Sequence, residues 1–381
     1  MSTATVVPTT PAGPLSGAVL AEALGRTRVP GLDFLRAIAV LLVLINHSGL
    51  YKIGPLAVFD GGFGVEMFFV LSGFLITGLL LDELDKTGGI RLGSFYRRRA
   101  ARLLPVFYAY LLIGLAYRLW RDSPIPWGAI VAAAVYVLNY YEIVFGTESR
   151  YVFHCWSLSV EEQFYLLWPL ALLFVVRRGW SISKSLVVLV VAVWLLRPLL
   201  IIAFNVGDVY LYRALETRAD QLGVGCLLAV AVRTVQWRAF FERMASRLWL
   251  VLALLAGLIA SLTLFRGTLL FQYGLGYTLE PVLVALLIPV VILAASGTGW
   301  MARLLNARGP VLIGQISYGM YLFHPVLMDP SRHFFLRWLP GAIPLAVIFS
   351  ISVVFVVAYF SFRFFEQPLR QRLRGSATTQ A

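Results

Sequence analysis

The feature that most constrains this chain is a succession of apolar runs, each about as long as a membrane-spanning helix. A helix of about 20 apolar residues crosses the hydrocarbon core of a bilayer. The composition agrees, because 60% of the 381 residues are hydrophobic and 13% are charged, whereas soluble domains carry about 25% charged residues. No polar stretch is long enough to enclose a soluble core of its own. The sequence therefore predicts an all-α integral membrane protein and excludes a soluble enzyme.

Basic residues set the expected number and direction of the spans. The apolar runs give eleven candidate spans, but eleven crossings would divide the Lys and Arg residues almost evenly between the two sides. If the segment at about 122–156 enters and leaves on the outer side without crossing, most basic residues become cytoplasmic, as the positive-inside rule requires. We therefore expect a bundle of about ten transmembrane helices with an outer re-entrant or loop segment. Both termini are expected in the cytoplasm, and the inner (plasma) membrane is the expected location.

The rest of the chain divides simply. We expect a flexible cytoplasmic N-terminal tail at 1–30, a transmembrane domain at 31–368 and a cytoplasmic C-terminal tail at 369–381. The formal net charge of +13 is explained by topology and by attraction to anionic lipids, so no nucleic-acid partner is predicted. Cys155 and Cys226 lie far apart without C-x-x-C spacing, which indicates neither a disulfide framework nor a metal site. The oligomeric state stays open.

Ionisable residues inside spans are costly and therefore mark candidate functional sites. The first span, "GLDFLRAIAVLLVLINHSG", contains Arg36 and His47, eleven residues apart. Eleven residues make about three helical turns, so both side chains leave one face, roughly 16 Å apart. This spacing suggests a path with a fixed cation near the cytoplasmic end and an imidazole near the outer end. Alternatively, Arg36 snorkels to lipid headgroups and His47 only packs as a satisfied polar residue.

Four arginines begin the third span, in "SFYRRRAARLLP": Arg97, Arg98, Arg99 and Arg102. Composition alone favours simple anchoring by the positive-inside rule. The functional alternative is a phosphate-binding site, because one guanidinium group can bind two phosphate oxygens at once. Arg99 and Arg102, three residues apart, would share a helix face.

Two adjacent carboxylates lie in "HCWSLSVEEQFYLLWP" just inside the outer end of a span, namely Glu161 and Glu162. Neighbouring residues on a helix point in different directions, so we expect at most one of them to face a site. That carboxylate would orient the imidazole of His47 or hold a hydroxyl-rich substrate. The alternative is that these charges only complement the helix dipole.

Further polar residues interrupt the apolar helices. In "ISYGMYLFHPV", the side chains of Ser317, Tyr321 and His324 form one stripe, which suits an interhelical hydrogen-bond ladder as well as substrate contact. The second span adds Glu66 and Ser72, and a serine nucleophile would need a nearby base.

Close helix approach is expected at Gly64 and Gly73 of the second span. In "TRADQLGVG", Arg218 and Asp220 fit a mutually paired motif or a binding site equally well.

Seven ordered strings resemble acyltransferase family 3, the membrane-bound O-acyltransferases that include bacterial surface-glycan O-acetylases. The strings are "LDFLRAIAVLLVLINH", "GVEMFFVLSGFLI", "FYRRRAARLLP", "WSLSVEEQFYLLWP", "TRADQLGVG", "ISYGMYLFHP" and "FFEQP". One such string would carry little weight, but seven in family order are specific. The resemblance covers nearly the whole chain, from about Gly31 to Pro368.

The resemblance implies ten transmembrane helices, acyl-CoA (commonly acetyl-CoA) as the cytoplasmic donor, and a sugar hydroxyl as the acceptor on the outer side. The arginine-x10-histidine pair of the family matches Arg36 and His47, and its R-x-x-R element matches Arg99 and Arg102. The usual aspartate of the second helix is Glu66 here, one methylene longer.

The residues and the resemblance together give an expected site. The expected catalytic residues are His47, Arg36 and Glu161. The phosphates of acyl-CoA are expected at Arg36, Arg98, Arg99 and Arg102. Acceptor contacts are expected from Glu66, Ser72, Trp156, Glu162, Tyr318 and His324. No metal is expected.

The functional hypothesis is a membrane O-acyltransferase that acylates an external carbohydrate, with the lipid bilayer, acyl-CoA and the acceptor as its partners. His47 would deprotonate the acceptor hydroxyl or carry the acyl group itself, and the sequence does not choose between these. The alternatives are acylation of the sugar of a secreted small molecule, a secondary transporter and a non-catalytic scaffold. The acceptor and the acyl length stay open.

Overall fold

The computed structural model describes residues 16–48, 61–146, 151–265 and 267–369, and within these ranges every regular element is helical. The long helices are α2 (Leu32–Ser48), α3 (Gly61–Thr87), α4 (Leu92–Trp120), α7 (Cys155–Arg177), α8 (Ile182–Phe204), α12 (Leu248–Leu264), α13 (Tyr277–Ser296), α16 (Ser317–Trp338) and α17 (Ile343–Phe360). The shorter helices are α1 (Ala18–Gly25), α5 (Trp127–Ala134), α6 (Leu138–Phe145), α9 (Asp208–Arg213), α10 (Ala219–Ala231), α11 (Val235–Ala245), α14 (Trp300–Leu305) and α15 (Arg308–Gln315). A 3₁₀ helix forms η3 (Leu215–Thr217), and π-helices form η4 (Leu270–Gly276) and η5 (Ser361–Glu366).

The helices confirm an all-α, multi-pass membrane protein. Six of the described helices are long and apolar enough to cross a bilayer, or up to eight if each of two bent pairs is one span. The bent pairs are α10 with α11, at 105°, and α15 with α16, at 73°. Ten spans would also require α2 and α12, which have 17 residues each.

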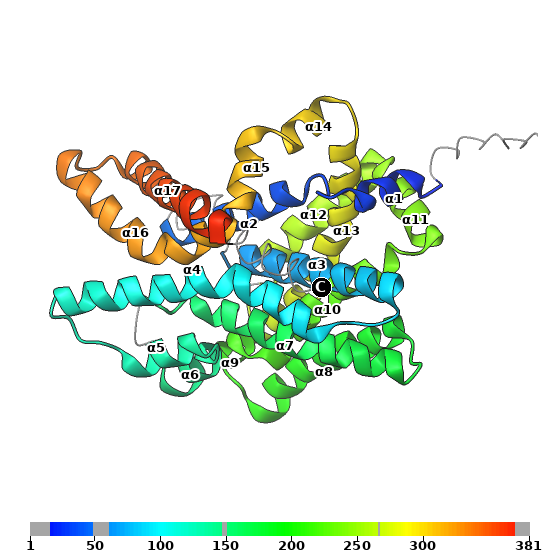
Figure 1. The fold of residues 1–381 in the computed structure, drawn as a ribbon, viewed down its shortest axis with the longest axis horizontal. Coiled ribbons are helices and arrows are strands. Elements are labelled where there is room, and N and C mark those ends of the chain that lie inside the picture. Colours follow the sequence, from blue (N-terminus) through cyan, green and yellow to red (C-terminus); the bar gives the residue numbers. More distant parts are fainter. Residues whose placement is uncertain (1–15, 49–60, 147–150, 266, 370–381) are drawn as a thin grey trace, which may run out of the picture.

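Helix α3 lies at the centre of the bundle (Figure 1), and most of its apolar residues are buried. Its tightest neighbours are α2 and α10. A Cβ atom on Gly64 would lie 2.5 Å from the carbonyl oxygen of Ala39, and one on Gly73 would lie 2.0 Å from that of Leu222. Only glycine permits this approach of backbones, as the positions of Gly64 and Gly73 predict.

The segment at 122–156 contains two helices, α5 and α6, of eight residues each. Eight residues extend about 12 Å, far less than a bilayer needs. The turn between them holds Tyr136 in the left-handed region, with φ of 56°. Gln163 of α7 fixes this turn, because its side-chain amide donates to the carbonyl of Tyr136 at 2.7 Å and to Asn139 at 2.9 Å. The segment therefore folds against α7 (Figure 1).

Glu142 anchors the same segment from α6. Its carboxylate is 2% exposed and pairs with Arg213 of α9 at 2.9 Å. Burial raises the pKa of Glu142 to about 7, although the neighbouring Arg213 guanidinium opposes that rise.

Within the described residues two ion pairs are fully buried, and neither is the pair of Arg218 with Asp220 that is one of the two interpretations of the sequence. Asp220 bonds Arg197 of α8 at 2.8 Å, and Arg218 lies 3.5 Å from Glu66 of α3. Arg218 and Asp220 are therefore not partners of each other. Residues two apart around a helix start point to different sides, so each reaches a different neighbouring helix.

The N-terminal tail differs in part from the expectation. Ala18–Gly25 forms α1, and the side chain of Leu20 within it is fully buried. The carboxylate of Glu242 in α11 accepts hydrogen bonds from the backbone amides of Gly17 and Leu20, at 2.7 Å and 2.9 Å. The backbone amides at the start of α1, which have no acceptor within the helix, are thereby hydrogen-bonded by a side chain distant in the sequence. Residues 1–15 and 370–381, which hold the rest of both expected tails, lie outside the described residues.

Candidate active site

A polar cavity of about 150 Å³ opens among α2, α3, α4, α7, α15 and α16. Its charged and hydroxyl-bearing lining consists of Arg36, Ser72, Arg99, Arg102, Tyr136, Glu161, Glu162, Tyr165, Ser317 and Tyr318. This volume holds several water molecules. We call it the inner cavity.

Both glutamates of α7 line the inner cavity, so the expectation that only one would face it is wrong. Glu161 accepts a hydrogen bond from Ser72 of α3 at 2.7 Å. Glu162 pairs at 2.9 Å with Arg99 of α4, whose guanidinium lies 3.1 Å from the centre of the Tyr165 ring. The cavity extends around α7, so two side chains that diverge from the helix still reach the same space.

The arginine cluster separates into two groups. Arg99 and Arg102 line the inner cavity together with Arg36 of α2, which is 3.6 Å from Asp33. Arg98 is outside that lining, because its guanidinium is 61% exposed and pairs with Glu83 at 3.3 Å. The i, i+3 spacing of Arg99 and Arg102 therefore identifies the cavity face of α4, whereas Arg98 faces the surface.

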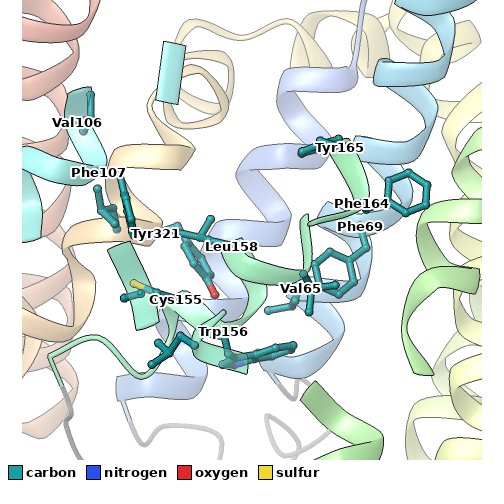
Figure 2. Close-up of a cluster of buried hydrophobic side chains, with 14 of the residues drawn as sticks. Val65, Phe69, Val106, Phe107, Cys155, Trp156, Leu158, Phe164, Tyr165 and Tyr321 are labelled. Atoms are coloured by element: carbon teal, nitrogen blue, oxygen red, sulfur yellow. The ribbon is translucent and has the colours of Figure 1, made fainter. Parts of the chain in front are cut away.

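A second, smaller cavity of about 50 Å³ continues from the first. The two share Phe68, Leu158, Glu161 and Tyr318 in their linings, and Ser157 and Tyr321 also line the smaller one. Figure 2 shows Tyr321 beside Leu158 in this region of the core. Ser157 of α7 and Tyr321 of α16 share a hydrogen bond.

The ring of Tyr321 contacts two of three neighbouring histidines. We call these three the histidine cluster: His47 of α2, His154 before α7 and His324 of α16. The ring centres of His47 and His324 are 4.7 Å apart, and those of His154 and His324 are 5.2 Å apart. Tyr321 connects the cluster to the cavities, because its hydroxyl donates to the carbonyl of His154 at 3.0 Å.

His154 was missed by the sequence analysis, although it stands two residues before Trp156 in "HCWSLSVEEQF". A single histidine at a helix start carries no signal in the sequence alone, and only the packing of α7 against α16 brings it to His324.

Arg36 and His47 line different spaces near the two ends of α2, as their spacing along the helix predicts. Arg36 lines the inner cavity, whereas His47 lines a tight crevice with Asp329 and Arg332 of α16. Arg332 donates to the carbonyl of Ser48 at 2.8 Å, which fixes the end of α2 beside His47. One part of α2 thus lines the inner cavity, and its other end lines the crevice.

The expected acceptor contacts also separate. Ser72, Glu162 and Tyr318 line the inner cavity. Glu66 is fully buried against Arg218, and Trp156 packs on Tyr212 with ring centres 4.7 Å apart. Neither Glu66 nor Trp156 lines the two cavities or the crevice, so a role in substrate contact stays a prediction for both.

Within the described ranges, no group of three or more His, Cys, Asp or Glu side chains is arranged to hold a metal ion. The three rings of the histidine cluster meet edge to face rather than converging on one point.

Comparison with known proteins adds a family to this geometry. A family model described as an acyltransferase domain, that of acyltransferase family 3, matches residues 29–362. The chain belongs to acyltransferase family 3. The matched range contains the inner cavity, the smaller cavity and the histidine cluster.

Two curated relatives of the chain are proteins of Staphylococcus aureus. A protein of strain COL that is provisionally named an O-acetyltransferase is 32% identical over 371 residues, covering 90% of this chain and 57% of the relative. O-acetyltransferase OatA of strain NCTC 8325 is 30% identical with the same coverage. The chain thus spans 57% of the length of these relatives. No solved structure gives a significant match.

Proposed function

We propose that this acyltransferase moves an acyl group, in the simplest case acetyl, from acyl-CoA in the cytoplasm to a carbohydrate hydroxyl on the outer side of the membrane. The observation that carries the proposal is the continuity of the site. The arginine-lined inner cavity shares lining residues with the smaller cavity, which is also lined by the hydrogen-bonded Ser157 and Tyr321. The ring of Tyr321 in turn contacts His324 of the histidine cluster. The O-acetyltransferase names of the relatives support the reaction type.

The donor half of the proposal rests on Arg36, Arg99 and Arg102. These three guanidinium groups line one cavity from two helices, and such groups suit the phosphate oxygens of CoA. The acyl end would extend past Glu161 into the smaller cavity, whose lining is mostly apolar and suits a thioester arm.

The chemistry requires a base or nucleophile, which we assign to His47. Its Nδ1 donates to the carbonyl of Val43 at 2.9 Å, because a carbonyl only accepts. That bond fixes the tautomer and leaves Nε2 as the basic nitrogen of the ring. His47 is therefore set up either to deprotonate the acceptor hydroxyl or to attack the thioester.

The topology that this proposal needs is ten spans, formed by the eight candidates together with α2 and α12, with both termini in the cytoplasm. The segment with α5 and α6 then stays on the outer side. Tyr136 in its turn lines the inner cavity, which requires this segment to reach well into the protein.

Mass spectrometry of envelope and secreted glycans tests the function directly. Cells that carry the gene should yield carbohydrate with an added O-acetyl mass, and cells without it should lose that increment. An unchanged glycan profile, together with an acylated secreted compound, would shift the acceptor to a small molecule. An unchanged profile of both would refute the proposal and leave a transport or scaffold function.

Arg102 and Arg98 form a matched pair of variants for the donor site. We expect Arg102→Ala to raise the KM for acyl-CoA by about tenfold or more, since a charge-assisted hydrogen bond contributes roughly 1.5–3 kcal/mol. Arg98→Ala should leave that KM unchanged, because Arg98 faces Glu83 outside the cavity. Acyl-CoA titrations of the purified proteins measure both. Equal effects of the two substitutions would contradict the location of the donor site.

A further inference from the structure

The mechanism proposed above assigns the chemistry to His47 alone and gives His324 no role. Its side chain is fully buried, and its Nδ1 bonds the carbonyl of Tyr321, so Nδ1 carries the proton. The other ring nitrogen, Nε2, has no hydrogen-bond partner anywhere in the described part of the chain. A buried polar atom without a partner is costly and calls for an explanation.

His47 and His324 share this ring chemistry. In both rings Nδ1 donates to a backbone carbonyl of the preceding helical turn, so in the neutral form of each imidazole Nε2 is the basic nitrogen. Their ring centres are 4.7 Å apart, at an interplanar angle of 64°. Two basic nitrogens from different helices are thus close enough to act on one reacting group.

A route through an acyl-histidine needs two such groups. If His47 carries the acyl group on Nε2, that nitrogen no longer takes a proton, and the incoming hydroxyl needs another base. Glu161 already accepts a hydrogen bond from Ser72, whereas the ring of His324 lies in contact with the ring of His47. We propose that His324 is a second catalytic base, which takes the acceptor's proton while His47 carries the acyl group.

The proposed steps balance as follows. The lone pair of His47 Nε2 bonds the thioester carbonyl carbon, the carbon–sulfur bond breaks, and CoA leaves as a thiolate. The acceptor oxygen then bonds the same carbon, its proton passes to His324 Nε2, and the carbon–nitrogen bond returns its electrons to His47. The His324 imidazolium gives its proton to the thiolate, directly or through water. The net products are the ester and the CoA thiol.

The inference rests on the proposed function, so its test compares half-reactions in one purified enzyme given acetyl-labelled acetyl-CoA. Wild type should form labelled ester with a carbohydrate acceptor. His324→Gln should lose ester formation by about 100-fold or more, as expected when a general base is removed. The same variant should still take up one label per enzyme on His47 when the acceptor is left out.

Hydroxylamine separates a missing base from a damaged fold. This uncharged nucleophile removes acyl groups with little help from a base, so His324→Gln should deacylate with hydroxylamine at the wild-type rate. His333→Gln is the matched control, because His333 lies on the same helix and is exposed. It should keep full ester formation.

Each other outcome has a definite meaning. Normal ester formation by His324→Gln overturns the second base and leaves the proposed function intact. Loss of both labelling and hydroxylamine deacylation in His324→Gln also overturns the inference, because the first half-reaction does not need His324. An inactive wild type under all conditions refutes the proposed function instead.

Discussion

Replacing His47 with alanine is expected to abolish acyl transfer while the protein stays folded in the membrane. A positioned general base contributes about 10²–10⁴-fold to a rate, and loss of a nucleophile removes the covalent route altogether. The measurement is the rate of ester formation by purified His47→Ala, compared with wild type at matched protein concentration.

Stability should change little in this variant, because His47 is only partly buried. His333→Ala supplies the control, since it removes an exposed imidazole of the same protein. Full activity of His47→Ala would rule out its catalytic role and point to a scaffold or transport function.

The second large effect is structural, and it concerns Asp220. Both members of its ion pair with Arg197 are fully buried, and Arg197 also donates to the carbonyl of Thr217 and to the hydroxyl of Thr278. We expect Asp220→Ala to lower the free energy of unfolding by about 3–5 kcal/mol, because it leaves the Arg197 guanidinium buried without its counter-charge. Thermal unfolding in detergent and the yield of monodisperse protein measure this effect.

Asp85 provides the matched comparison. It also pairs with an arginine, Arg233, but its side chain is 63% exposed. An exposed pair contributes about 0–1 kcal/mol, so Asp85→Ala should unfold almost as wild type does. Equal stability of Asp220→Ala and wild type would contradict the buried pair. Replacing Arg197 with Met in the Asp220→Ala background should restore part of the stability, since no buried charge then remains.

Much of the site follows from local sequence patterns. The spacing of Arg36 and His47 predicts two ends of one helix face, and the structure has one at the inner cavity and the other at the crevice. The i, i+3 spacing of Arg99 and Arg102 likewise predicts a shared face of α4. Such predictions succeed because both residues of each pair belong to one helix, whose geometry is nearly independent of its surroundings.

Patterns that depend on two helices were not predictable in this way. Arg218 and Asp220 fit a mutual pair or a binding site equally well in the sequence, yet each pairs with a different helix. The directions of Glu161 and Glu162 around α7 are as expected, but the shape of the cavity lets both line it. His154 shows no signal until α16 brings His324 within 5.2 Å of it.

The sequence by itself determined the class of molecule. Apolar runs of membrane length require helices, because a bilayer leaves no other way to satisfy the backbone amides of a single span. The tertiary structure alone decided which polar groups meet, namely Ser72 with Glu161, Arg99 with Glu162 and His47 with His324. The period of a helix fixes the face of each residue, whereas the facing partner depends on the packing of helices far apart in the chain.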